Sequence, residues 1–149
     1  MSKISLMPEL AEVPAIDDEF AVRDISDNGT VATGVTKRVS RKNALGYTEY
    51  VALLTQSGAN APTATTIKND TGATVTWTRS IAGFYVGTFS SAVLTTNKTV
   101  QFINEQSNLY HYRTSYGGTS SVVVYTMNLT GTLVDGVLNG TPVVVRIYV

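Results

Sequence analysis

Apolar and polar side chains alternate with a period of two residues through most of the chain after Gly46, which predicts short β-strands. The segments TVTWTRS and IAGFYVGTFS alternate on either side of a glycine-containing turn and predict a hairpin, with Val75 and Trp77 on one face and Trp77 in the core. In NKTVQFINE, Val100 and Phe102 share one face of another predicted strand. No segment of this region sustains a helical period. The pattern predicts an all-β domain, either a β-sandwich or a jelly-roll-like fold.

The segment YTEYVALLTQS fits a helix or a strand, and its tyrosines, threonines and valine favour a strand. Further along, three apolar runs are separated by Asp135-Gly136 and Asn139-Gly140, which are strong turn signals. The last run, PVVVRIYV, is either a central strand of the sandwich or part of a sheet shared between subunits, because an apolar strand left at an edge attracts other chains. We favour the first alternative.

Residues 1–46 follow a different pattern. EFAVRDI alternates and predicts a strand that contains Phe20 and Val22, SDNGT supplies a turn, and GVTKRVS predicts a second strand that contains Val39. Ser40 fits the N-cap of a short helix over SRKNAL, which a glycine would end. A hairpin and a short helix bury little apolar surface alone, so we expect this module to lean on neighbours or on copies of itself.

Charge divides the chain at the same point. Residues 1–46 carry seven acidic and six basic side chains, whereas residues 47–149 carry four acidic and five basic ones and are rich in threonine. We therefore expect an N-terminal arm and module over residues 1–46 and a β-rich domain over residues 47–149. The zero net charge argues against nucleic-acid binding. The basic stretch TKRVSRKNALG does not form one basic stripe, because Lys37 and Arg38 alternate along a predicted strand.

Several features exclude other classes of site. The chain has no cysteine, so it forms no disulfide or thiolate zinc site, and we expect no metal and no cofactor. No apolar run approaches the roughly 18 residues of a membrane span. The N-terminal residues lack the apolar core of a signal peptide, so we expect a protein made in the cytoplasm without membrane insertion. Five N-x-T sequons are interpreted as products of turn and strand chemistry. They begin at Asn28, Asn69, Asn97, Asn128 and Asn139.

Side chains that could carry catalysis are few. His111 is the only histidine, and the chain has no G-x-S-x-G motif for a serine nucleophile. Glycoside hydrolysis needs two carboxylates across a cleft, and the acidic residues of the β-rich region are widely spaced in the sequence. These acidic residues are Glu49, Asp70, Glu105 and Asp135. We therefore expect no enzyme, and a polysaccharide hydrolase is only a remote alternative.

The segment NLYHYRTSYGG is unusually rich in aromatic residues. On an alternating strand Tyr110 and Tyr112 share one face, and His111 and Arg113 share the other. Tyrosine and arginine are common in binding hot spots, and aromatic rings also stack on sugars. Alternatively, the tyrosines pack inside the sandwich with their hydroxyl groups at its rim. The candidate ligand or partner surface consists of Tyr110, His111, Tyr112, Arg113 and Tyr116.

The N-terminal segment resembles one that recurs in structural proteins of tailed bacteriophages, especially fibre and tail-associated proteins. In those proteins a strand of the type D-x-F-x-V-x-D is followed by a turn, by TKRVT/S and by a short helix that ends in leucine. The β-rich region is similar to domains of phage and prophage proteins. The matching residues are Asp18, Phe20, Val22, Asp24, Thr36, Lys37, Arg38, Val39, Ser40 and Leu45.

The resemblance implies a non-enzymatic virion protein: a short head fibre, a capsid decoration or a tail adaptor. Residues 1–46 would attach the chain to other virion proteins of the capsid or tail, and residues 47–149 would project. Fibres of this kind are mostly trimers, so a homo-oligomer is expected. A projecting domain would also suit binding of a host-surface glycan or protein. The virion-attachment residues that the resemblance implies are Phe20, Val22, Asp24, Lys37, Arg38, Val39 and Leu45.

Overall fold

The protein divides into two units, residues 1–46 and residues 47–149, and the change in composition falls at the same boundary. The computed structural model describes four stretches of the chain: 19–23, 36–40, 45–104 and 107–148.

The first unit contains an antiparallel pair of strands, in which Phe20 lies opposite Val39. The two strands are β1 (Glu19–Arg23) and β2 (Thr36–Ser40). They coincide with the two alternating segments of the sequence, so both predicted strands are confirmed. The short helix predicted after β2 falls mainly on residues 41–44, which lie outside the described residues.

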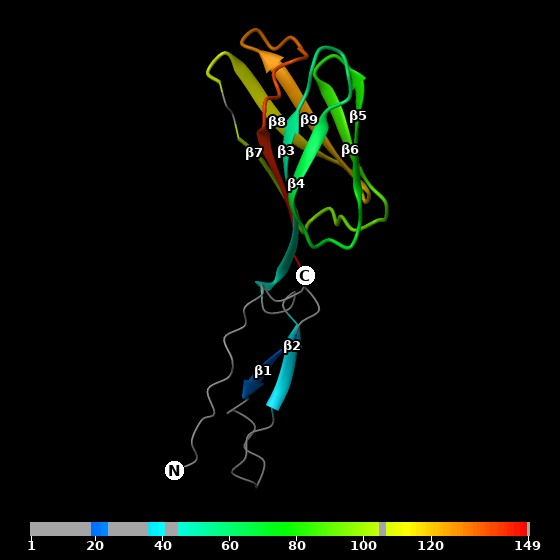
Figure 1. The fold of residues 1–149 in the computed structure, drawn as a ribbon, viewed down its shortest axis with the longest axis vertical. Helices are drawn as coiled ribbons and strands as arrows, with labels where there is room; N and C mark the ends of the chain where they lie inside the picture. Colours follow the sequence, from blue (N-terminus) through cyan, green and yellow to red (C-terminus); the bar gives the residue numbers. More distant parts are fainter. Residues whose placement is uncertain (1–18, 24–35, 41–44, 105–106, 149) are drawn as a thin grey trace. The chain divides into compact units, whose positions relative to one another are not determined.

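The second unit consists of two four-stranded antiparallel sheets packed against each other (Figure 1). Sheet I has the strand order β4-β3-β10-β7, and sheet II has the order β5-β6-β9-β8. Three pairs of consecutive strands (β3–β4, β5–β6 and β8–β9) are neighbours within one sheet, an arrangement that identifies a β-sandwich built from hairpins. The strands are β3 (Tyr47–Thr55), β4 (Thr63–Asn69), β5 (Val75–Ile81), β6 (Phe84–Phe89), β7 (Thr99–Ile103), β8 (Tyr110–Gly118), β9 (Ser121–Asn128) and β10 (Thr141–Tyr148).

The last apolar run of the sequence is a central strand. β10 pairs with β3 on one side and with β7 on the other. Val143 and Val145 are fully buried between the sheets, while Val144 points to the outer face of sheet I. The strand is apolar in consecutive positions because both of its edges are paired and its inner face lines the core. The first of the two alternatives for this run is therefore correct.

The core lies between the sheets and is centred on aromatic side chains. Trp77 is buried as predicted, and its indole N–H donates a hydrogen bond to the hydroxyl of Tyr50 over 3.1 Å. Phe89 packs edge-on against Tyr50, with ring centroids 5.8 Å apart. Gly87 lies opposite Trp77 in the hairpin, and a Cβ there would come within 2.8 Å of the indole ring. The indole ring therefore needs glycine at this position.

Residues 129–140 form a loop, although the apolar runs of this region suggested a further strand. An isolated bridge to β9 is the only ladder contact in the described residues of this loop. Gly136 and Gly140 both adopt positive φ, and the turns at these positions leave too few residues between them to form a strand. The loop still contributes to the core, because Leu138 is 1% exposed.

Two of the N-x-T sequons stabilise turns. The side-chain oxygen of Asn69 accepts hydrogen bonds from the amide and the hydroxyl of Thr71. Asn128 makes the same pair of contacts with Thr130. In both cases the asparagine and the threonine two positions later form one local capping unit. The interpretation of these two sequons as turn chemistry is therefore confirmed.

Candidate functional site

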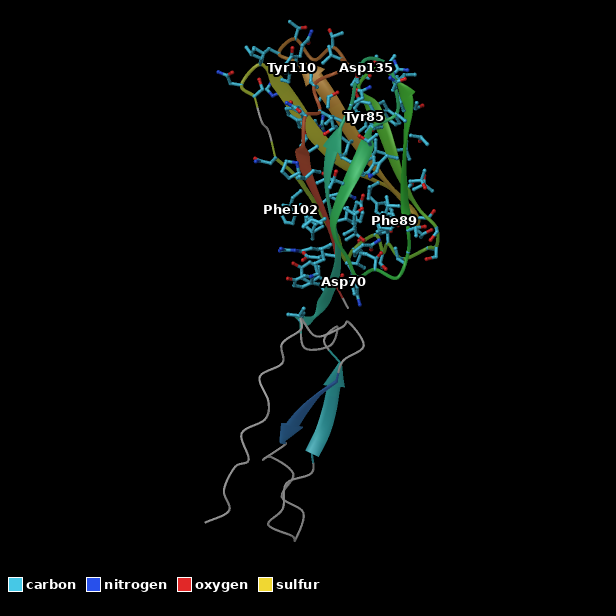
Figure 2. The ribbon with its side chains drawn as sticks, viewed as in Figure 1. Asp70, Tyr85, Phe89, Phe102, Tyr110 and Asp135 are labelled. Carbon is cyan, nitrogen blue, oxygen red and sulfur yellow. The ribbon has the colours of Figure 1, made fainter. Side chains whose placement is uncertain are left out.

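The carboxylate of Asp135 is surrounded by donors at one end of the sandwich (Figure 2). Arg79 of β5 binds it in a bidentate manner, with distances of 3.1 Å from Nε and 2.7 Å from Nη2 to Oδ2. Further donors to Oδ1 come from the β5–β6 turn, from β6 and from the end of β3. They are the amide of Gly83 at 3.0 Å, the hydroxyl of Tyr85 at 3.0 Å and Nε2 of Gln56 at 3.2 Å.

In this group of residues, the Asp135 cluster, the hydrogen bonds favour an ionised carboxylate and a protonated tyrosine near neutral pH. The hydrogen bonds from Arg79 are the main reason that the pKa of Asp135 lies well below its ordinary value, and those from Gly83, Gln56 and Tyr85 add to the effect. Burial raises the pKa of Tyr85 to about 12, and the hydrogen bond to Asp135 acts in the same direction. Asp135 therefore stays ionised and Tyr85 stays protonated. The cluster ties the loop of residues 129–140 to both sheets.

A second charged group, the Glu49 cluster, lies on the outer face of sheet I. Lys68 Nζ is 2.8 Å from Glu49 Oε1 and 3.2 Å from Asp70 Oδ2, and Arg146 Nε is 2.9 Å from Glu49 Oε2. The backbone amide of Glu49 also donates to Asp70. Glu49 and Asp70 are widely spaced in the sequence, and the β3–β4 hairpin, in which Tyr50 lies opposite Asn69, brings them side by side.

The electrostatics of the Glu49 cluster do not suit acid catalysis. Partial burial opposes the ionisation of Glu49, but hydrogen bonds from Lys68 and Arg146 outweigh it and hold the pKa of its carboxyl below the ordinary value. Partial burial likewise opposes the charge of Lys68, and its carboxylate partners outweigh that effect and raise its pKa. A glycosidase needs a carboxylic acid with a raised pKa as its proton donor. Glu49 has the opposite shift.

This outer face, which we call face I, is otherwise mainly apolar on β3, β10 and β7, while Thr65 of β4 lies opposite the outward-facing Leu53. Phe102 is 50% exposed and Val100 is 40% exposed, both on the edge strand β7 (Figure 2). The guanidinium of Arg146 lies 5.0 Å from the ring centroid of Tyr47 and 5.9 Å from that of Phe102, so the cation is placed between two aromatic rings. The other apolar side chains of face I come from β3 and β10. They are Val51, Leu53, Pro142, Val144 and Tyr148.

The predicted surface on β8 is divided between two sides of sheet II. Tyr112 is buried, and its hydroxyl donates a hydrogen bond to the carbonyl of Val137 over 3.0 Å. Tyr110 and Tyr116 are partly buried and pack against the core. His111 and Arg113, at the alternate positions, are exposed on the outer face. The five residues therefore do not form one surface, because a strand alternates its side chains between its two faces. The alternative in which the tyrosines pack inside describes their positions.

Arg113, one of the two exposed residues of the predicted surface, has aromatic neighbours on the adjacent strands that the sequence did not reveal. Arg113 lies opposite Tyr125 of β9, which lies opposite Phe84 of β6, so the three side chains form a row across three strands. The rings of Phe84 and Tyr125 pack edge-to-face with centroids 5.0 Å apart. Among the described residues Arg113 has no carboxylate partner. This outer face of sheet II, which we call face II, therefore combines partly exposed aromatic rings with the exposed guanidinium of Arg113.

The predicted virion-attachment residues mostly belong to the first unit's strand pair. β1 contains two of them and β2 contains three, while Leu45 lies just before the second unit. The β1 residues are Phe20 and Val22, and the β2 residues are Lys37, Arg38 and Val39. Asp24 lies outside the described residues. Their role in attachment stays a prediction.

No family model, curated protein or solved structure matches the chain. Within the stretches that the structure describes, no helix is long and apolar enough to cross a membrane. The same stretches contain no group of three or more histidine or carboxylate side chains placed to share a metal ion.

Proposed function

We propose that this chain is a non-enzymatic structural protein of a bacteriophage virion, of the short head fibre, capsid decoration or tail adaptor type. In this proposal residues 1–46 hold the chain to capsid or tail proteins, and the sandwich of residues 47–149 projects from the particle. The resemblance of the N-terminal segment suggests the virion, and a β-sandwich fits the projecting domain that the resemblance implies.

The observation that carries the proposal is the pairing of the carboxylates in the sandwich with lysine and arginine side chains. Each described carboxylate of this unit is held by a lysine or an arginine: Glu49 by Lys68 and Arg146, and Asp135 by Arg79. Asp70 is also paired with Lys68. Carboxylates committed in this way stabilise the fold and are poorly suited to accept or donate protons in catalysis. A structural role therefore fits the chemistry better than a hydrolase does.

The proposal is tested by asking where the chain is found in lysates of a host that carries its gene. Particles are purified by gradient sedimentation, and their protein composition is measured by quantitative mass spectrometry. We expect the chain in the particle fractions at a constant ratio to the major capsid protein. Recovery of the chain only in fractions free of particles would contradict the proposal.

The attachment role has its own test in the same host. The double substitution Phe20→Asp with Val39→Asp places two charges opposite each other in the first unit and should remove the chain from the particles. Ile67→Asp, at a position 62% exposed on β4, is the matched control and should leave incorporation unchanged. Normal incorporation of the double variant would mean that this strand pair does not hold the chain.

A second candidate function is binding of a host-surface glycan or protein, and face II favours it. Partly exposed aromatic rings beside an exposed arginine suit a sugar ring that carries an acidic group. Binding to a glycan array should be lost in Arg113→Ala and in Tyr125→Ser, and Thr88→Ala on the same face is the control. If the native chain binds no glycan and no cell-surface protein, this second candidate fails while the structural proposal stands.

A further inference from the structure

Face I differs from face II at the edge of its sheet. In sheet II the edge strands direct mainly polar side chains outward, including Thr76 and Thr78 on β5 and Ser115 on β8, and Ile81 at the end of β5 is an apolar exception that is 56% exposed. In sheet I the edge strand β4 also directs polar side chains outward, Thr65 and Lys68, whereas the other edge strand β7 directs Val100 and Phe102 outward, so the apolar rim is the one formed by β7. The apolar surface of face I therefore continues from the central strands to the rim, where a solitary sandwich normally places polar groups.

The charges of face I cancel within the face. Glu49 and Asp70 supply two negative charges, and Lys68 and Arg146 supply two positive charges, all within one connected set of ion pairs. Such a set can be covered without leaving a lone charge away from water, which is the costly case. A surface that meets its own copy also has to avoid facing like charges, and a neutral surface meets that condition.

The partner is further indicated by the residue types that cross the face from β3 to the edge strand β7. Tyr47, Arg146 and Phe102 form a diagonal stripe in which the guanidinium already lies between the two rings. Aromatic residues and arginine are enriched in the buried centres of protein interfaces. Because Arg146 is held by Glu49 and by these rings, little side-chain entropy remains to be lost when the face is covered.

The size of the face suits association between copies. Four strands at a spacing of about 4.8 Å, and a rise of about 3.4 Å for each of the eight residues of β10, give a projected area on the order of 500 Å². The accessible area of a surface with ridges of side chains exceeds its projection. This is the same order as the roughly 800 Å² that each partner contributes to a standard interface.

We infer that copies of this chain associate through face I, with the Tyr47–Arg146–Phe102 stripe at the centre of the contact. The inference does not depend on the proposed virion role, since it rests on the apolar edge, the neutral charge set and the stripe.

The test is the solution mass of the full chain, measured by sedimentation velocity over a series of concentrations. The native chain should sediment as a multiple of 16.0 kDa at high concentration and dissociate on dilution. Phe102→Asp places a charge in the apolar stripe and should raise the dissociation constant at least tenfold. Leu129→Asp, at a position that is 59% exposed in the loop after β9, is the matched control and should associate as the native chain does.

A second variant distinguishes weaker association from a folding defect. Val100→Lys changes a different exposed side chain of the same face, and far-ultraviolet circular dichroism checks that both variants keep the strand signal of the native chain. We expect Val100→Lys to weaken association as well. A native chain that stays monomeric at all concentrations would overturn the inference. So would a folded Phe102→Asp or Val100→Lys variant that associates as strongly as the native chain, because the contact would then lie elsewhere, for example in residues 1–46.

Discussion

The Asp135 cluster and the Glu49 cluster use the same chemistry in two different surroundings. Asp135 lies at one end of the sandwich and receives donors from β3, β5, the β5–β6 turn and β6, so the chain completes this cluster by itself. Glu49 lies on an outer face, and its ion pairs are flanked by apolar side chains that stay exposed in a single chain.

The difference indicates what each cluster is for. A carboxylate with donors on every side holds a loop in place, and it works in one isolated molecule. The side chain of Glu49 is only 11% exposed, but its partners Lys68 and Arg146 are 29% and 37% exposed, so water screens these ion pairs from the cation side in an isolated molecule. When the face is covered by another surface, these ion pairs favour association, because no charge of the group is left unpaired away from water. Stability experiments should therefore separate the two clusters.

The largest effect is expected from Asp135→Ala. The change leaves the Arg79 guanidinium and the Gly83 amide without their acceptor, and it should lower the free energy of unfolding by about 3 kcal/mol. Urea denaturation followed by tryptophan fluorescence measures the change through Trp77. Thr88→Ala, at an exposed position, is the control. A loss below about 1 kcal/mol would mean that water replaces the carboxylate and that the cluster does not hold the loop.

Lowering the pH should remove the contribution of Asp135 to the free energy of unfolding. Its pKa is lower in the folded chain than the ordinary value of 3.8, so the stability that it contributes is complete above that value and is lost as the pH falls through the folded pKa. The difference in unfolding free energy between the native chain and Asp135→Asn should be constant near neutral pH and should shrink below about pH 4. A difference that stays constant into strong acid would contradict the assignment of a lowered pKa.

Tyr85→Phe should have an intermediate effect. The variant loses a buried hydroxyl that lies 2.7 Å from Gln56 Oε1 and 3.0 Å from Asp135 Oδ1, and we expect a loss of about 1–2 kcal/mol in the free energy of unfolding. Tyr148→Phe makes the same chemical change at an exposed position of face I and should alter stability by less than about 0.5 kcal/mol. Equal losses in the two variants would remove the contrast between the clusters.

Glu49→Gln should have the smallest effect on an isolated chain. We expect a loss of about 1 kcal/mol or less at low ionic strength, decreasing as salt is added, because Lys68 and Arg146 are 29% and 37% exposed and water and salt screen the ion pairs from their side. The measurement is urea denaturation at two salt concentrations and at a protein concentration low enough to keep the chain dissociated. A salt-independent loss as large as that of Asp135→Ala would show that the two clusters contribute equally to the stability of the isolated chain.

Much of the fold could be predicted from the sequence, because period-two alternation is a local property. TVTWTRS and PVVVRIYV were identified as strands, and Trp77 was placed in the core, from neighbouring residues alone. The limit appears at β7 and β8. Alternation correctly grouped Val100 with Phe102 and Tyr110 with Tyr112, yet it could not say which group faces the core. The apolar pair on β7 lies outside, and the tyrosines lie inside.

The clusters could not be predicted, because they depend on long-range register. Arg79 and Asp135 are 56 positions apart, and Glu49 and Arg146 are 97 positions apart. Their meeting requires the order of all the strands between them. The sequence marked Asp135 only as a turn residue, since an aspartate before a glycine fits many turns equally well. The row of Arg113, Tyr125 and Phe84 was missed for the same reason, because it spans three strands of sheet II.

The most direct test of the central claim, that one face of the sandwich is completed by another copy of the chain, uses the absence of cysteine from the sequence. Val100→Cys introduces a single thiol on face I, and its rate of reaction with a maleimide is measured as the full chain is diluted. We predict slow labelling at high concentration and faster labelling on dilution, while Leu129→Cys reacts at one rate throughout. A Val100→Cys thiol that reacts at the same fast rate at every concentration would contradict the claim.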